Sequence, residues 1–285
     1  MTYAYCKRSL DEGTPKGKES VIAGVSCYIS QPSSPNGCAI ILATDIFGYK
    51  LVNSRLIADV FADNGFLTVV PDYFQGAPMN IALLETYEAL PSMSLLGKLG
   101  GYAQLAGQIV GMGSWFKRHP VEYAIDVVTA AAAELREKHG ARKVGLQGYC
   151  YGGKVGVKMA AKPESVDAVC SAHPGLIKIP EDIQAVQVPL QFICAASDAQ
   201  FPEKTRTAAQ QLLQQQSPDL GRFILYPGTQ HGFAVRGSKA DPAVNAARQD
   251  ALQQGIGFFK QHLEGVQPPA VQGQADAAAA VGLVL

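Results

Sequence analysis

One segment of the sequence combines a nucleophilic side chain with the glycines that a tight turn needs. Cys150 stands at the centre of GYCYG (148–152), after an apolar run that predicts a strand and before a stretch that predicts a helix. This is the pattern of a nucleophile elbow, with Cys in place of Ser. Glycine fits two positions either side of the nucleophile because it has no Cβ where backbones approach closely. At the helix start, the Tyr151 N–H would face the oxyanion of an acyl-transfer reaction.

Two further residues stand where the partners of such a nucleophile would be needed. Asp198 follows the apolar run 189–196, and His231 follows the apolar run 222–227. The order nucleophile, acid, histidine along the chain is the one found with this type of elbow. Because both residues come just after predicted strands, they are expected at the sheet edge where open α/β sheets carry their sites. We therefore predict a triad in which His231 accepts the thiol proton and Asp198 orients the His231 ring.

Each of these residues also has a simpler interpretation. Cys150 fits a structural cysteine in a glycine-rich turn, and such turns also bind phosphates. Asp198 fits a loop aspartate that caps the helix predicted at 203, and His231 fits a turn histidine under the last helix. Three matches in chain order, each at a strand end, favour the triad. Of the remaining histidines, His173 follows a predicted strand most closely and is the one expected near the site.

The rest of the chain alternates strand and helix patterns. One run of alternating polarity, 25–30, is predicted as an edge strand. The other predicted strands are 38–44, 66–70, 143–148, 166–172, 189–196 and 222–227. The predicted helices are 51–64, 121–139, 151–161, 203–216 and 242–263. Such alternation predicts an α/β fold, with a mainly parallel central sheet and helices on both faces, in a single domain over 1–264.

Two segments break this alternation. Residues 75–114 are rich in Gly, Met, Leu and Ala and carry no strand pattern. A long insertion of this kind usually covers something, so we expect it to lie over the site and line its pocket. Its apolar composition favours neutral or hydrophobic acyl groups over dicarboxylates. Residues 265–285 are low in complexity and are predicted to form a disordered tail.

Charge and cysteine content exclude several classes of partner. The 285-residue chain carries 24 Lys and Arg against 24 Asp and Glu, so its formal net charge is zero and no basic stripe predicts a nucleic acid or membrane partner. Its 6 cysteines are too scattered for a disulfide framework or a zinc site, and no metal or cofactor is expected. Without an apolar run of signal-peptide or membrane-helix length, a cytoplasmic location is expected. The expected partner is a small-molecule substrate, bound by a monomer or homodimer.

The combination of motifs resembles the dienelactone hydrolase family, and the resemblance runs from about residue 10 to residue 263. It looks closest to the eukaryotic-type, carboxymethylenebutenolidase-like branch of this family within the α/β-hydrolase superfamily. The resemblance implies a single α/β-hydrolase domain and a Cys-His-Asp triad. The matching pieces are GTPKGK (13–18), DIFG (45–48), PDY (71–73), the elbow, Asp198 and HGFAVRG (231–237).

The resemblance also implies roles for three further residues. The backbone N–H of Ile46 would be the second oxyanion donor, beside that of Tyr151. Asp45 would lie near the resting Cys150 and control its proton, although a turn-capping role for Asp45 is an open alternative. Arg236 would bind an anionic group of the substrate. The best-known bacterial members have a glutamate in place of Asp45 and an arginine in the segment where residues 73–117 have none, so a dienelactone substrate does not follow.

These observations together predict an enzyme that cleaves small ester or lactone bonds, and possibly thioesters, through an acyl-cysteine at Cys150. The alternative is a ligand-binding or redox-sensing protein on a hydrolase scaffold, because a fold does not fix a function. The intact triad favours the enzyme. A glycan hydrolase ranks below both, since glycosidases use two carboxylates and Cys150 between Asp45 and Asp198 would have no task.

Overall fold

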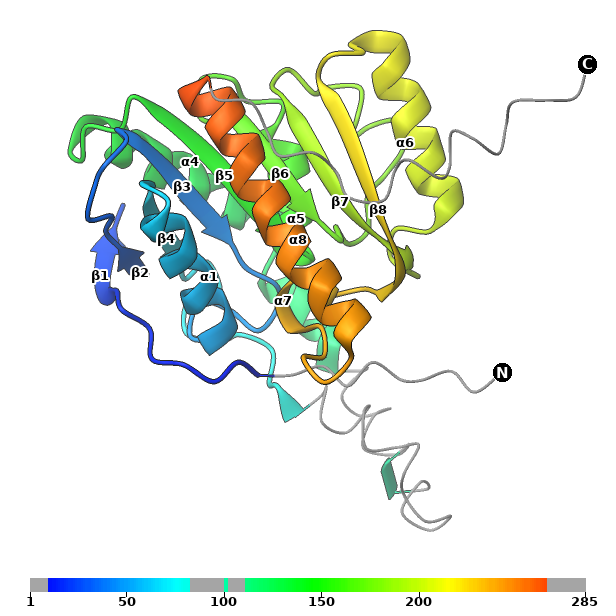
Figure 1. The fold of residues 1–285 in the computed structure, drawn as a ribbon, viewed down its shortest axis with the longest axis horizontal. Helices are drawn as coiled ribbons and strands as arrows, with labels where there is room; N and C mark the ends of the chain where they lie inside the picture. The colour runs from blue at the N-terminus through cyan, green and yellow to red at the C-terminus, as the bar shows by residue number, and fades with distance from the viewer. Residues whose placement is uncertain (1–9, 83–99, 102–110, 266–285) are drawn as a thin grey trace, which may run out of the picture.

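An eight-stranded sheet in the order β1-β2-β4-β3-β5-β6-β7-β8 organises the part of the chain that the computed structural model describes, residues 10–82, 100–101 and 111–265 (Figure 1). The strands are β1 (Lys18–Ile22), β2 (Val25–Ser30), β3 (Cys38–Ala43), β4 (Leu67–Pro71), β5 (Lys143–Tyr149), β6 (Ala168–Ala172), β7 (Leu190–Ser197) and β8 (Gly221–Gln230). Strands β1 and β2 are antiparallel to their neighbours, and the pairs from β4 to β8 are all parallel. The predicted mainly parallel sheet is confirmed.

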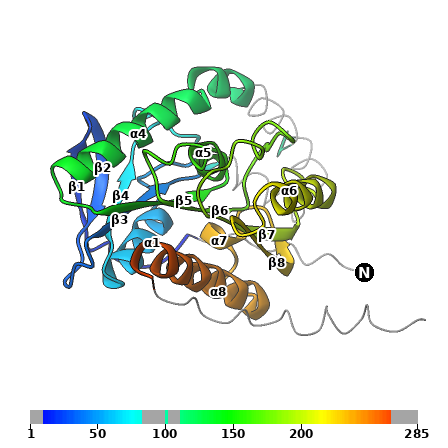
Figure 2. The same cartoon turned by 90° about the horizontal axis from the view of Figure 1, so that it is seen from above.

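Helices cover both faces of this sheet. They are α1 (Val52–Asp63), α4 (Val121–Glu137), α5 (Tyr151–Met159), α6 (Glu203–Gln216), α7 (Phe233–Arg236), α8 (Pro242–Phe259) and a π-helical turn, η2 (Lys260–Glu264). Figure 2 shows α1 and α8 on one face and α4, α5 and α6 on the other. Each face has its own apolar core, and β3 between them is buried along its whole length. A strand with two covered faces needs the continuous apolar run that CAIILA supplies.

Two strand predictions need correction. Residues 25–30 form a strand, but not an edge strand, because β1 pairs with β2 and takes the edge position. The sequence of β1, KESVI, is too polar and too exposed to stand out as a strand. Strand β8 also continues three residues past Pro227, where the prediction stopped. Proline is tolerated there because β8 is the other edge of the sheet.

The predicted insertion and tail fall largely outside the described residues. Of the 75–114 segment, the structure describes 75–82, 100–101 and 111–114, so the remainder of that prediction lies outside it. The prediction for the tail concerns residues of which only Gly265 is described. Within the described ranges, no helix is long and apolar enough to cross a membrane, and no cluster of three or more metal-binding side chains occurs.

Candidate active site

The elbow places Cys150 in a strained backbone conformation at the start of α5. Its φ of 54° and ψ of −110° lie in a region that non-glycine residues rarely adopt, at a cost of roughly 1–3 kcal/mol. The flanking glycines permit the turn. A Cβ on Gly148 would lie 2.2 Å from the Gly152 carbonyl oxygen, and one on Gly152 would lie 2.1 Å from that of Ala43. The backbone N–H of Gly152 donates to the Thr44 carbonyl oxygen at 2.9 Å, which joins the elbow to the loop after β3.

Asp198 and His231 meet at the carboxyl ends of β7 and β8. The Nδ1 atom of His231 lies 2.8 Å from Oδ2 and 3.0 Å from Oδ1 of Asp198. The Oδ1 atom also accepts backbone N–H groups of Gln200 at 2.8 Å and Phe201 at 3.2 Å. Asp198 therefore contacts the His231 ring and does not cap α6, whose first turn follows Pro202 without a side-chain cap.

The pKa of His231 is influenced by both Cys150 and Asp198. Burial lowers the pKa of His231, but the charge of Cys150, hydrogen bonds with Asp198 and Cys150, and the charge of Asp198 raise it to about 10. Burial raises the pKa of Asp198, but the hydrogen bond with His231, the charge of His231 and the hydrogen bond from the Gln200 N–H together lower the pKa below its ordinary value. These contacts stabilise the protonated form of the His231 ring.

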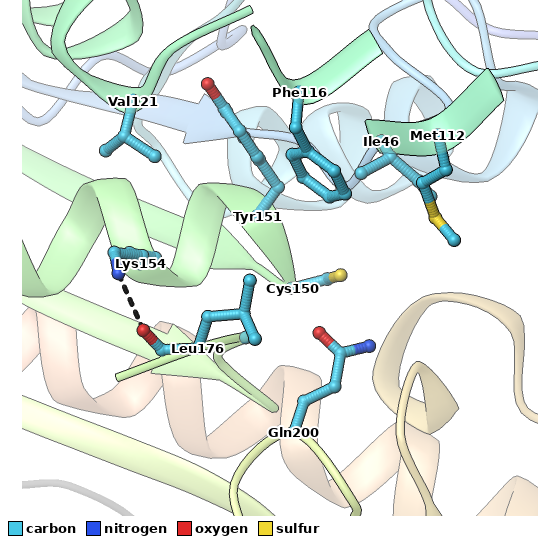
Figure 3. A pocket seen from close by; sticks show the side chains of 10 residues that line it. Ile46, Met112, Phe116, Val121, Cys150, Tyr151, Lys154, Leu176 and Gln200 are labelled. Carbon is cyan, nitrogen blue, oxygen red and sulfur yellow. Dashed lines mark hydrogen bonds between the residues drawn. The ribbon is translucent and has the colours of Figure 1, made fainter. Parts of the chain in front are cut away.

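The residues predicted as oxyanion donors lie beside Cys150. Ile46 and Tyr151 both line the same pocket as Cys150 (Figure 3). Tyr151 is the first residue of α5, where backbone N–H groups have no partner within the helix. The Ile46 carbonyl oxygen accepts the Met79 N–H at 2.8 Å, which ties the loop after β3 to the segment after β4.

Asp45 and Arg236 form a buried ion pair behind this loop. The Asp45 Oδ1 atom accepts the Phe47 N–H at 2.9 Å, and its Oδ2 atom pairs with the Arg236 guanidinium, which lies 4.7 Å from the centre of the Phe47 ring. Both charged residues are at most 3% exposed. The hydrogen bond from the Phe47 N–H is the contact that a turn-capping Asp45 makes. Arg236, predicted from the resemblance to bind substrate, is paired with Asp45 and is absent from the described pocket lining.

A mainly apolar pocket of about 310 Å³ opens next to Cys150 (Figure 3). Met112, from the described part of the 75–114 segment, is one of its walls. Two polar residues in the lining, Lys154 and Gln200, were missed by the sequence reasoning. Position offered a signal for both, since Lys154 lies one helical turn after Cys150 and Gln200 lies two residues after Asp198. The full described lining is Ile46, Met112, Phe116, Val121, Cys150, Tyr151, Lys154, Gly175, Leu176 and Gln200.

His173 lies near the site, as its position after β6 indicated. Its ring is fully buried and meets the His231 ring edge-on, with centroids 5.2 Å apart. Its backbone φ is 36°, a second strained non-glycine residue beside the elbow. By contrast, His119 packs among aromatic rings with its Nδ1 atom 2.9 Å from the Trp115 carbonyl oxygen. The His231 ring is therefore packed against a second imidazole.

Comparisons with known proteins identify the family of the chain. The family model described as "Dienelactone hydrolase family" matches residues 25–263. The hydrolase pyvD of Aspergillus violaceofuscus is 33% identical over 259 residues, covering 90% of this chain and 94% of that protein. The human carboxymethylenebutenolidase homolog is 27% identical over 242 residues, covering 83% and 89%.

Solved structures share the fold at lower identity. A putative dienelactone hydrolase from Klebsiella pneumoniae superimposes with a TM-score of 0.65 at 19% identity, covering 86% of this chain and 98% of that one. A dienelactone hydrolase from Anabaena variabilis gives 0.57 at 17% identity, covering 87% and 99%. The predicted fold class and enzyme class, a hydrolase, are confirmed. The chain belongs to the dienelactone hydrolase family.

Proposed function

We propose that this hydrolase cleaves small ester or lactone bonds through an acyl-cysteine intermediate on Cys150. The observation that carries the proposal is the chain of contacts from Asp198 through His231 to Cys150, at the wall of an apolar pocket. The relatives' names add support, since dienelactones and butenolides are cyclic esters.

In the proposed reaction, His231 accepts the Cys150 thiol proton, and the thiolate attacks the carbonyl carbon of the substrate. The carbonyl electrons move onto oxygen, where backbone N–H groups of Ile46 and Tyr151 stabilise the oxyanion. Collapse of this intermediate breaks the C–O bond, and the leaving alkoxide takes the proton from the His231 imidazolium. Water then attacks the thioester as His231 accepts its proton. The C–S bond breaks, the acid product leaves, and the Cys150 thiolate takes that proton back from His231.

Asp198 has an orienting role in this scheme. It accepts the His231 Nδ1–H and two backbone N–H groups, so the His231 ring is held with Nε2 available to the thiol. Asp45 and Arg236 have a supporting role. Their ion pair holds the turn that carries Ile46, and therefore holds the second oxyanion donor in place.

Turnover on a small panel tests the proposal. The panel contains 4-nitrophenyl acetate and hexanoate, a γ-lactone, and an acyl thioester. Wild-type protein should turn over the activated esters, and Cys150→Ala should not. Cys38→Ala is the matched control, because Cys38 is also a buried cysteine but lies at the opposite, amino end of β3. Absence of turnover across the panel, with ligand still bound, would favour the binding or sensing alternative.

A further inference from the structure

The segment that follows β6 contacts the main chain of Cys150 on both sides. Strand β6 lies between β5, which leads into the elbow, and β7, which leads to Asp198 (Figure 1). The Cys150 N–H donates to the Ala172 carbonyl oxygen at 3.1 Å, and the Cys150 carbonyl oxygen accepts the Gly175 N–H at 3.1 Å. His173 stands between these two contacts along the chain, so its position is fixed relative to the Cys150 backbone.

The side chain of His173 packs against His231, the proposed general base. The His173 ring is 0% exposed and lies edge-on to the His231 ring, at an interplanar angle of 66°. The buried rings of Tyr149 and Phe233 lie 6.0 and 5.9 Å from the His173 ring, measured between centroids. His173 is therefore held among three aromatic rings, one of which is the His231 imidazole.

This packing supplies a restraint on His231 that Asp198 does not. The two Asp198 oxygens lie 3.0 and 2.8 Å from the same ring atom of His231, Nδ1. Contacts at a single atom leave a planar ring free to pivot about that atom, and such a pivot would move Nε2 relative to Cys150. A second rigid ring packed against the imidazole opposes the pivot, because a close-packed interior leaves no space for it.

The backbone of His173 does not by itself explain a buried imidazole at this position. Its φ of 36° lies in the left-handed region, at a cost of roughly 1–3 kcal/mol for a non-glycine residue. Such strain persists where the surrounding structure fixes the residue, and the His173 N–H donates to the Ile193 carbonyl oxygen at 2.7 Å. Glycine and asparagine adopt this conformation at least as readily as histidine. The packing of the ring is therefore the feature that calls for histidine.

We propose that His173 is a positioning residue for the general base: its ring holds the His231 imidazole with Nε2 directed toward the Cys150 sulfur, while the main chain beside it holds Cys150. This inference rests on the proposed function and extends it. His173 is absent from the described pocket lining and exchanges no proton with the substrate. It acts through His231, which accepts and returns a proton in both acylation and deacylation.

Replacing His173 with asparagine tests the inference, because asparagine tolerates the left-handed backbone but removes the ring. A displacement of about 1 Å can lower a rate about 100-fold, so kcat for 4-nitrophenyl acetate should fall about 10- to 100-fold in His173→Asn. Both chemical steps use the same His231 nitrogen and the pocket is unaltered, so KM should stay within about threefold of the wild-type value. His173→Phe keeps a planar ring against His231 and should retain a kcat within about fivefold of wild type.

A matched control separates this effect from a loss of core packing. Cys170 is also fully buried on β6, three positions before His173. Its sulfur accepts the Gln191 Nε2–H at 3.5 Å in the core beneath α8. Cys170→Ala should therefore lower the urea midpoint and keep the wild-type kcat.

The orientation of the His231 ring can also be followed without substrate. In protein labelled with ¹⁵N-histidine, the Nδ1 proton shared with Asp198 should give a low-field NMR resonance that is lost in His231→Gln. The resonance should be retained in Cys170→Ala and in His173→Phe. It should broaden or move upfield in His173→Asn, because the His231 ring becomes free to pivot.

A wild-type kcat in folded His173→Asn would overturn the inference, as would an equal fall in Cys170→Ala or in His173→Phe. If His173→Asn does not fold, His173→Gln takes its place, because glutamine fills more of the space without supplying a rigid ring, and the same fall in kcat is required. If wild-type protein hydrolyses no ester, the proposed function fails. The NMR resonance then still decides whether His173 orients the His231 ring, and an unchanged resonance in His173→Asn would overturn that role.

Discussion

Replacing Arg236 with Met removes one member of a buried ion pair and leaves the Asp45 carboxylate without its counter-charge. The Arg236 side chain is 4% exposed and that of Asp45 is 0% exposed. Loss of one partner from such a pair costs about 3–5 kcal/mol. At roughly 2–4 °C per kcal/mol for a protein of about this size, the melting temperature should fall by roughly 6–20 °C.

The double variant shows whether the unpaired carboxylate causes this loss. Asp45→Asn combined with Arg236→Met leaves no unpaired charge at these two positions, so it should be more stable than Arg236→Met alone by about 1–3 kcal/mol. Urea unfolding followed by tryptophan fluorescence measures both values, because Trp115 is the single tryptophan of the chain and is buried.

A small effect would refute the reasoning. If Arg236→Met cost less than about 1 kcal/mol, or if the two substitutions were additive, Arg236 would not be a buried partner of Asp45. A substrate-binding role for Arg236 would then regain support.

Three further predictions concern the elbow, the triad and Asp45. Gly152→Ala should lower the free energy of unfolding by at least about 3 kcal/mol or prevent folding, as measured by urea unfolding. The Cβ of the introduced alanine would lie 2.1 Å from the Ala43 carbonyl oxygen. The pKa of His231 is raised from 6.5 to about 10, so its stabilising contribution is complete below pH 6.5 and lost as pH rises toward 10. Urea midpoints should fall across that window, and less steeply in Cys150→Ala; equal slopes in both proteins would contradict the pairing. Asp45→Asn should lower stability and leave the pH profile of Cys150 alkylation unaltered, as expected of a turn residue. A shifted profile would instead support the hypothesis that Asp45 controls the proton of the Cys150 thiol.

The sequence was most informative where local pattern and burial agree. Strand β3 is buried on both faces, and its uninterrupted apolar run predicted it almost to the residue. The elbow was predictable because sterics at Gly148 and Gly152 exclude every other residue type. Strand β1 was not predictable in the same way. Its residues are mostly exposed, so its pairing with β2 depends on backbone hydrogen bonds that leave no mark in the sequence.

The contacts that could not be predicted from the sequence are those between segments far apart along the chain. Arg236 and Asp45 are separated by most of the chain, and only the fold brings their charges together in the interior. The same holds for Lys154, whose position on α5 could be predicted, but whose neighbours Leu176 and Asp182 come from the segment after β6. Charged residues at such places look like ordinary surface residues until their burial is known.

The identity of the acylated residue tests the central proposal most directly. Wild-type protein mixed with 4-nitrophenyl hexanoate and quenched in acid during the first turnover can be digested and examined by mass spectrometry. The account predicts one hexanoyl group on the peptide that carries Cys150, and neither adduct nor turnover in a Cys150→Ala variant that keeps the wild-type urea midpoint. Continued ester hydrolysis by folded Cys150→Ala, or an acyl group on a different residue, would contradict it.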